Sequence, residues 1–332
     1  MSKKLLGLLF AMILVFSFTV GCGNGDGDAP GAGGDDGVFE VVFLPTDMSH
    51  TFASWLASEL EQVFEGYDDM NLTIIDSQNQ LQNQISALET SVEQGYDYII
   101  LLPLEPDALA EKVTGIIEDG TPVMMINLDN FAVAEASSVI ANPYDLGTVV
   151  ANYAISLLPE DANVVVLLGP SGNTCSIERR RAYEEIIFSQ YPNITILDEQ
   201  IGGWEKSRGM SLMEGWIQVH GDSIDAVLSM NDAMAIGAWE AAAAAGVADG
   251  MLFFGVDGLA DAAVSIEEGG LTATALQDAL VMAQEAARVV HEILTGVNTA
   301  GMEEHEIAVT LITSANVDEF IERYRASGKL AD

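Results

Sequence analysis

Cysteine, histidine and basic residues are all scarce in this chain of 332 residues. It contains two cysteines, Cys22 and Cys175, so a disulfide framework is excluded. Its four histidines are scattered and do not form the H-E-x-x-H pattern of a zinc peptidase, so no metal site is predicted. Cys175 has no visible base beside it, and we expect it to be a small, partly buried apolar residue.

The shortage of positive charge is extreme. Lys and Arg together number 12 against 51 Asp and Glu, for a formal net charge of −39. Such a surface repels phosphates and anionic membrane surfaces, so nucleic acid is not a predicted partner. The acidity indicates solubility or adaptation to salt, with a specific basic partner as the alternative. Hydrophobic residues make up 49% of the chain, enough for a substantial core.

Catalytic motifs are also missing. The chain has no G-x-x-x-x-G-K-[ST] phosphate loop, and residues 169–172 (GPSG) only approximate a G-x-S-x-G nucleophile elbow. The glycines at 21–27 do not follow a strand, so they are not a dinucleotide fingerprint. The sequence therefore predicts no catalytic residues, no cofactor and no enzymatic activity.

The first residues have the pattern of a targeting segment. Lys3 and Lys4 precede an apolar run over residues 5–20, and Gly21 and Cys22 follow it. The run is short for a membrane span. Residues 19–22 (TVGC) resemble a bacterial lipobox, although Thr19 replaces the usual leucine. We predict a signal peptide over 1–21 and a lipidated Cys22; an ordinary signal peptide and an uncleaved anchor are the alternatives. Residues 22–37 are rich in Gly and Asp and predict a flexible tether.

From residue 39 onward, short apolar runs alternate with stretches of helical periodicity. This alternation predicts buried parallel strands covered by helices on both faces. Eleven strands are too many for one small sheet, and the pattern restarts after residue 141, which predicts two doubly wound α/β domains. The predicted strands are 39–44, 71–76, 97–102, 122–127, 137–141, 163–169, 193–198, 225–230, 251–256, 271–276 and 306–311.

Ligands of such sheets bind beyond the carboxyl ends of the strands. A sugar needs planar polar groups for its hydroxyls and an aromatic ring for its C–H face. The segments that follow the predicted strands supply both kinds of group. The aromatic candidates are Phe52 and Trp204, and the polar candidates are Asn127, Asn231, Asp257 and Gln277.

Three ordered motifs resemble those of the ribose-binding family of periplasmic solute-binding proteins. Residues 231–238 (NDAMAIGA) resemble its N-D-x-M-A-x-G-A segment, residues 254–258 (FGVDG) a strand end, and residues 273–277 (ATALQ) a hinge strand. The resemblance covers roughly residues 39–312. It implies a type I periplasmic-binding-protein fold, with two lobes joined by three crossovers that close on ligand. The implied lobes are residues 38–142 with 278–306, and residues 143–277 with 307–330.

The resemblance also implies roles for single residues. His50 and Phe52 fall in the first ligand loop, and Trp204 falls at the aromatic position of the second lobe. Asn231, Asp257 and Gln277 match directly, Asn127 stands where the family uses Asp, and Arg179 is the best match for a binding arginine. Leu102 and Leu128 replace an asparagine and an arginine, which argues against ribose and leaves a small sugar or polyol.

Each assignment has a structural alternative. Phe52 and Trp204 are also consistent with packing at a domain edge, and His50 with a solvated loop. Asn231 and Asp257 are also consistent with helix caps. At least two of the three arginines at 179–181 are expected to pair with surface acids. Because loops at strand ends carry function more than stability, substitutions at Trp204 and Asp257 are predicted to leave folding intact.

The function implied is capture of a small sugar or polyol outside the cytoplasm and its delivery to the membrane subunits of an ABC importer. We expect a monomer held at the cell membrane by its lipid. The alternatives are a ligand sensor for a chemoreceptor or kinase and a secreted enzyme of the same fold class. A transcriptional regulator of similar fold needs an N-terminal helix-turn-helix and a basic surface, which this chain lacks.

Overall fold

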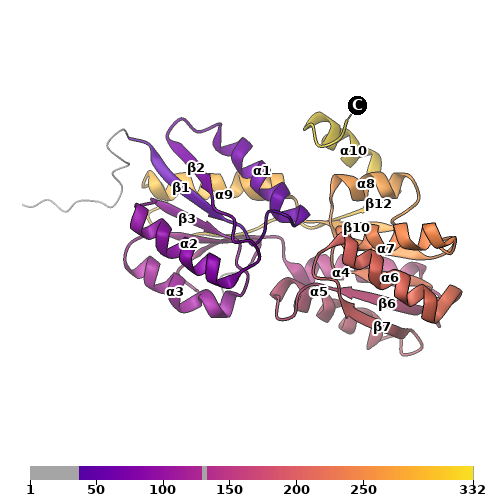
Figure 1. Cartoon of the computed structure of the whole chain (residues 1–332). Helices are drawn as coiled ribbons and strands as arrows, with labels where there is room; N and C mark the ends of the chain where they lie inside the picture. Colours follow the sequence, from indigo (N-terminus) through magenta and orange to yellow (C-terminus); the bar gives the residue numbers. More distant parts are fainter. Residues whose placement is uncertain (1–36, 129–132, 332) are drawn as a thin grey trace, which may run out of the picture. The chain divides into compact units, whose positions relative to one another are not determined.

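Two mainly parallel β-sheets, each with six strands, organise the chain (Figure 1). The computed structural model describes residues 37–128 and 133–331, and all of them fall within one unit spanning residues 32–332. The predicted signal peptide, Cys22 and nearly all of the tether lie outside the described residues. The predicted fold class, two doubly wound parallel-sheet domains, is confirmed.

The first sheet has the strand order β11-β5-β4-β3-β1-β2, and all its pairings are parallel. Helices α1 and α9 pack against each other, and α2 packs against α3 (Figure 1). The strands are β1 (Phe39–Leu44), β2 (Met70–Ile74), β3 (Tyr98–Leu101), β4 (Val123–Ile126), β5 (Ser137–Ile140) and β11 (Glu304–Glu306). The helices are α1 (Thr51–Phe64), α2 (Leu81–Gln94), α3 (Pro106–Glu118) and α9 (Ala279–Leu294).

The second sheet has the order β12-β10-β9-β8-β6-β7, and its edge strand β12 runs antiparallel to β10. Its strands are β6 (Asn163–Leu168), β7 (Thr195–Ile201), β8 (Ala226–Ser229), β9 (Leu252–Asp257), β10 (Ala273–Leu276) and β12 (Thr310–Thr313). Its helices are α4 (Pro143–Leu157), α5 (Thr174–Tyr183), α6 (Lys206–His220), α7 (Asp232–Ala245), α8 (Ala260–Glu267) and α10 (Val317–Ala326). A π-turn, η1 (Glu184–Phe188), extends α5, and a 3₁₀ turn, η2 (Gly221–Ser223), follows α6.

The central strands of each sheet are buried because their residues are largely apolar on both faces. Every residue of β3, β4, β8 and β10 is buried, as expected for parallel strands with helices on either side. Local sequence signals set where the helices between these strands begin and end. The left-handed residues Gly95 and Gly246 close α2 and α7, and Pro143 opens α4 behind the capping residue Asn142.

The prediction of a single strand over 306–311 is wrong. The structure has two strands there, because β11 pairs with β5 in the first sheet and β12 pairs with β10 in the second. Within the described residues the chain passes between the sheets after β5, after β10 and between β11 and β12. The segment at residue 277 therefore ends a strand of one sheet and leads directly into α9 over the other.

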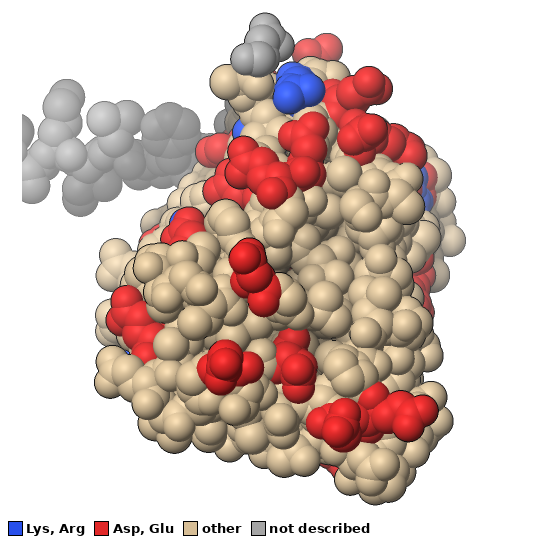
Figure 2. Space-filling view, turned by 90° about the vertical axis from the view of Figure 1, so that its right-hand side faces the viewer, with Lys and Arg blue, Asp and Glu red and all other residues tan. Residues whose placement is uncertain are grey.

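Acidic side chains are scattered over the face seen in Figure 2, where basic ones are few. Most of the described Lys and Arg residues form ion pairs. Arg180 pairs with Glu184 and Glu199, and Arg181 pairs with Glu178 and Glu185, which confirms the expected surface pairing of these two arginines. Within the described residues, no helix combines the length and apolar character needed to cross a bilayer.

Candidate ligand-binding site

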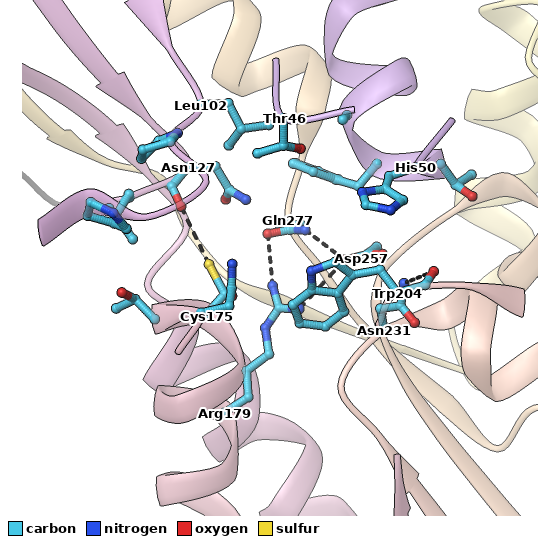
Figure 3. A pocket seen from close by; sticks show the side chains of 18 residues that line it. Thr46, His50, Leu102, Asn127, Cys175, Arg179, Trp204, Asn231, Asp257 and Gln277 are labelled. Carbon is cyan, nitrogen blue, oxygen red and sulfur yellow. Dashed lines mark hydrogen bonds and ion pairs between the residues drawn. The ribbon is translucent and has the colours of Figure 1, made fainter. Parts of the chain in front are cut away.

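One cavity lies beyond the carboxyl ends of strands from both sheets (Figure 3). Residues that follow β1, β3 and β4 line it from the first sheet, and residues that end or follow β7, β8, β9 and β10 line it from the second. The structure brings together all eight of the predicted ligand-binding residues here; that they bind ligand stays a prediction. They are His50, Phe52, Asn127, Arg179, Trp204, Asn231, Asp257 and Gln277.

A buried polar network forms the floor of the cavity. The Gln277 side-chain amide donates to Asp257 Oδ1 at 2.7 Å, and its oxygen accepts from Arg179 at 3.1 Å. Arg179 also donates to the Met230 carbonyl at 2.6 Å and lies 3.8 Å from Asp257 Oδ1. These side chains are almost fully buried, and burial raises the pKa of Asp257 well above its usual range, although the charge of Arg179 opposes that rise.

The charges of Arg179 and Asp257 balance each other, because the two side chains form a buried ion pair. A ligand that enters this site meets one cation and one anion already paired, together with neutral amides. The arrangement favours a neutral polar ligand over a strongly charged one.

Three residues that line the cavity have a left-handed backbone. The φ angles of Asn127, Trp204 and Asp257 are +60°, +72° and +129°, and only Gln78 and Asn79 share this property among the described non-glycine residues. Side chains rarely adopt such angles without cost, and strained residues concentrate at functional sites. The unusual backbone angles of these three residues are therefore a second indication that the cavity is a functional site, and this indication does not depend on the chemistry of their side chains.

Asn127 also carries an unsatisfied polar atom. Its backbone N–H donates to the Val139 carbonyl at 2.8 Å, but its side-chain Oδ1 is buried with no hydrogen-bond partner in the structure. A buried acceptor without a partner is unfavourable by about 1–3 kcal/mol. A ligand hydroxyl that donates to Asn127 would remove that cost.

Asn231 is a helix cap, as the structural alternative to its ligand-binding role predicts. Its Oδ1 accepts from Met234 N at 3.0 Å at the start of α7, and its side-chain N–H donates to the Trp204 carbonyl at 3.1 Å. It thereby fixes the loop that carries Trp204. The two roles remain compatible, because Asn231 also lines the cavity.

Asp257 is not a helix cap. It is the last residue of β9, and the capping residue of α8 is Leu259, which makes no side-chain capping bond. The neighbouring carboxylate of Asp232 fills the structural role instead. It accepts from Leu259 N at 2.8 Å and from Thr274 Oγ1 at 2.6 Å, which ties together the ends of β8, β9 and β10. Burial raises the pKa of Asp232 to about 6.

The aromatic residues differ in how tightly they are held. The Trp204 ring lies against Gly169, where an added Cβ would come within 2.2 Å of it, and Arg179 lies 5.8 Å from the ring centroid. Phe52 makes an edge contact with Trp55, with centroids 6.1 Å apart. His50 precedes α1 without capping it through its side chain.

Sequence reasoning missed part of the lining. Thr46, Pro106, Asn173 and Cys175 all line the cavity, and the Cys175 sulfur lies 3.8 Å from the Asn127 carbonyl oxygen. Most of these positions follow predicted strands, so the strand-end rule reaches them, but no side-chain chemistry distinguishes them from ordinary loop residues. Among the described residues, no group of His, Cys, Asp and Glu could hold a metal ion.

Comparison with known proteins places this geometry in a wider group. A family model described as a periplasmic binding protein domain matches residues 41–298. The D-apiose import binding protein of Actinobacillus succinogenes is 31% identical over 235 residues, covering 70% of this chain and 75% of that protein. The xylitol-binding protein of Mycolicibacterium smegmatis is 27% identical over 244 residues, covering 74% and 69%. A Bacillus halodurans ABC transporter solute-binding protein, solved with bound myo-inositol, superposes with a TM-score of 0.81 at 25% identity, covering 88% and 100%.

Proposed function

This chain belongs to the periplasmic binding protein domain family, and from that premise we propose that it captures a small neutral sugar or polyol and delivers it to an ABC importer. Relatives of this chain carry names that describe import binding proteins for apiose and ribose and a binding protein for xylitol. The function is binding and release; catalysis has no part in it. The site of action is outside the cytoplasm.

The observation that carries the proposal is the charge-balanced network of Asp257, Gln277 and Arg179, next to the Trp204 ring. Carboxylate, amide and guanidinium groups bind hydroxyls as acceptors and donors, and an indole face packs on sugar C–H groups. Because the side chains are buried, each hydrogen bond to ligand replaces a lost bond to water. A ligand hydroxyl without a partner there costs about 1–3 kcal/mol.

Two lobes are proposed to close on this ligand. They comprise residues 38–142 with 278–306 and residues 143–277 with 307–330, joined where the chain passes between the sheets. A polar cleft between hinged domains closes when both sides contact the same ligand. The radius of gyration measured by small-angle scattering should therefore fall when the ligand saturates the protein, and an unchanged radius would contradict closure.

Membrane attachment is proposed to occur through Cys22, after removal of residues 1–21, with residues 22–37 as the tether of a monomer. Cys22→Ser should move the protein from the membrane fraction to the soluble fraction, because it removes the thiol that carries the lipid. A matched Cys175→Ser variant should stay with the membrane. Retention of the Cys22→Ser variant would contradict the anchor and leave the binding function untouched.

The binding function is tested by a thermal-shift screen of sugars, polyols and nucleosides, followed by calorimetry on the hits. A ligand that binds only the folded state raises the melting temperature with its concentration. We expect saturable binding of at least one neutral sugar or polyol. If all sugars and polyols leave the melting temperature unchanged while a nucleoside raises it, the proposed function is wrong.

A further inference from the structure

The cavity has two sides of different chemistry. Four apolar residues that follow β3 and β4 line it, and we call them the apolar wall: Leu102, Pro103, Pro106 and Leu128. Leu102 and Leu128 are 8% and 6% exposed, so their side chains belong to the packed core and still line the cavity. Arg179, Trp204 and Asn231 lie on the side of the cavity opposite Leu102 (Figure 3).

The backbone of the apolar wall offers the ligand little in place of the missing polar side chains. Gln84 of α2 is fully buried, and its side-chain amide donates to the Leu102 carbonyl at 3.0 Å. The oxygen of the same amide accepts from Leu104 N at 2.9 Å. Leu102 and Leu104, the two residues bonded by Gln84, flank Pro103 in the sequence. Pro103 and Pro106 have no backbone N–H to donate to a ligand. The Leu102 carbonyl and the Leu104 N–H are therefore already bonded within the protein, and the side chains of the apolar wall present only carbon to a ligand.

Asn127 interrupts this apolar side. It lies next to Leu128, and its buried Oδ1 is an acceptor without a partner in the structure. The loops after β3 and β4 thus present one position suited to a ligand hydroxyl, Asn127, among apolar side chains, while Thr46 and His50 line the cavity from the loop after β1. The second sheet presents the hydrogen-bonding groups of Asn231, Asp257 and Gln277.

We propose that the ligand is a neutral sugar or cyclitol in which one free hydroxyl is replaced by hydrogen or by a methoxy group, that is, a deoxy sugar or an O-methyl ether, and that Leu102 and Leu128 select it. This proposal rests on the proposed function, because it assigns the ligand class of that same site. The selection works in both directions. A ligand hydroxyl in contact with the apolar wall loses its hydrogen bonds to water and finds no partner in the protein, which weakens binding. A methyl group at the same place buries apolar surface, which strengthens binding.

The test compares matched ligand pairs by calorimetry on the unmodified protein. The pairs are D-galactose with D-fucose, L-mannose with L-rhamnose, D-ribose with 2-deoxy-D-ribose, and myo-inositol with its mono-O-methyl ethers. We expect at least one deoxy or O-methyl member to bind roughly ten- to a hundredfold more tightly than its fully hydroxylated partner, which is the penalty for one buried unpaired hydroxyl.

The outcomes separate this inference from the function on which it rests. If the protein binds sugars but prefers the fully hydroxylated member of every pair, the apolar wall does not select the ligand and the function survives. If no neutral sugar or polyol binds, both are overturned.

A substitution gives a second, independent readout. Leu102→Asn places an amide on the wall and should shift the preference within the selected pair toward the hydroxylated member by roughly tenfold. Leu104→Asn makes the same change in the same loop but outside the cavity lining, and it should leave the preference unchanged. Leu128→Asn provides the same test from the neighbouring strand end should Leu102→Asn not fold. An unchanged preference in a folded wall variant would overturn the assignment of these leucines.

Discussion

Asp257→Ala tests the centre of the site most directly, because it removes one member of a buried ion pair. Asp257 and Arg179 are each 2% exposed, and their charged groups lie 3.8 Å apart. The substitution also removes the acceptor for the Gln277 side-chain N–H at 2.7 Å. Arg179 would then remain buried without its counter-charge.

The structure sets the expected loss of stability. Removing one partner of a buried pair costs about 3–5 kcal/mol. Two features favour the lower end of that range: Arg179 keeps its bonds to the Met230 carbonyl and to Gln277, and burial raises the pKa of Asp257, so the carboxylate is itself poorly solvated. A loss of about 3 kcal/mol lowers the melting temperature by roughly 4–6 °C in a protein of this size, since the entropy of unfolding grows with chain length. The position of Asp257 at a strand end predicts, by itself, that the substitution leaves stability unchanged. The burial of Asp257 in the structure predicts the loss instead.

The expected loss of affinity comes from a different interaction. A hydrogen bond to a charged acceptor contributes about 1.5–3 kcal/mol, so Asp257→Ala should weaken ligand binding roughly tenfold to 150-fold. The two effects can be separated. Adding Arg179→Met to Asp257→Ala removes the unpaired cation and should recover much of the stability, while the affinity stays low.

Calorimetry gives both quantities, as the melting temperature without ligand and the dissociation constant with it. Asp261→Ala is the matched control, because this exposed carboxylate lies in the first turn of α8, just beyond β9, and makes no contact with the cavity. It should change neither quantity appreciably. If Asp257→Ala melts and binds like the parent, the buried pair and the placement of the ligand beside it are both refuted.

Three further perturbations follow from the same contacts. Trp204→Ala should weaken ligand binding roughly tenfold or more, because it removes the ring proposed to cover the ligand, and unchanged calorimetric affinity would exclude that role. Gly169→Ala should also weaken binding, since its Cβ would displace the Trp204 ring, whereas Gly215→Ala, with open space around it, should not; equal affinities in the two variants would contradict this. Because the pKa of Asp232 is about 6 when folded and near 3.8 when unfolded, the folded state holds that proton more tightly. The free energy of unfolding should thus fall by roughly 2 kcal/mol from this group as the pH rises from about 4 to about 6. In urea titrations across that range, Asp232→Asn should show a smaller fall than the parent, and an identical pH dependence would assign the effect to other groups.

Local patterning in the sequence was sufficient for the fold class and for most of the cavity. Buried parallel strands are apolar along most of their length, so β3 and β4 stand out from the helices between them. Ligand sites of such sheets lie at the carboxyl ends of strands, which is why residues such as Trp204 and Gln277 could be selected without coordinates. Both inferences use only neighbouring residues and a general rule of sheet architecture.

Tertiary structure alone decided which interactions those residues make. The run at 306–311 is continuous in sequence, yet it divides into β11 and β12, because each half pairs with a strand of a different sheet. Arg179 meets Gln277 across 98 residues of chain, and no local pattern records that contact. Asn231 caps a helix while Asp257 does not, because the two strand ends turn differently into α7 and α8. Pairings between distant segments depend on how the strands are ordered in the sheets, and that order is a property of the whole folded chain.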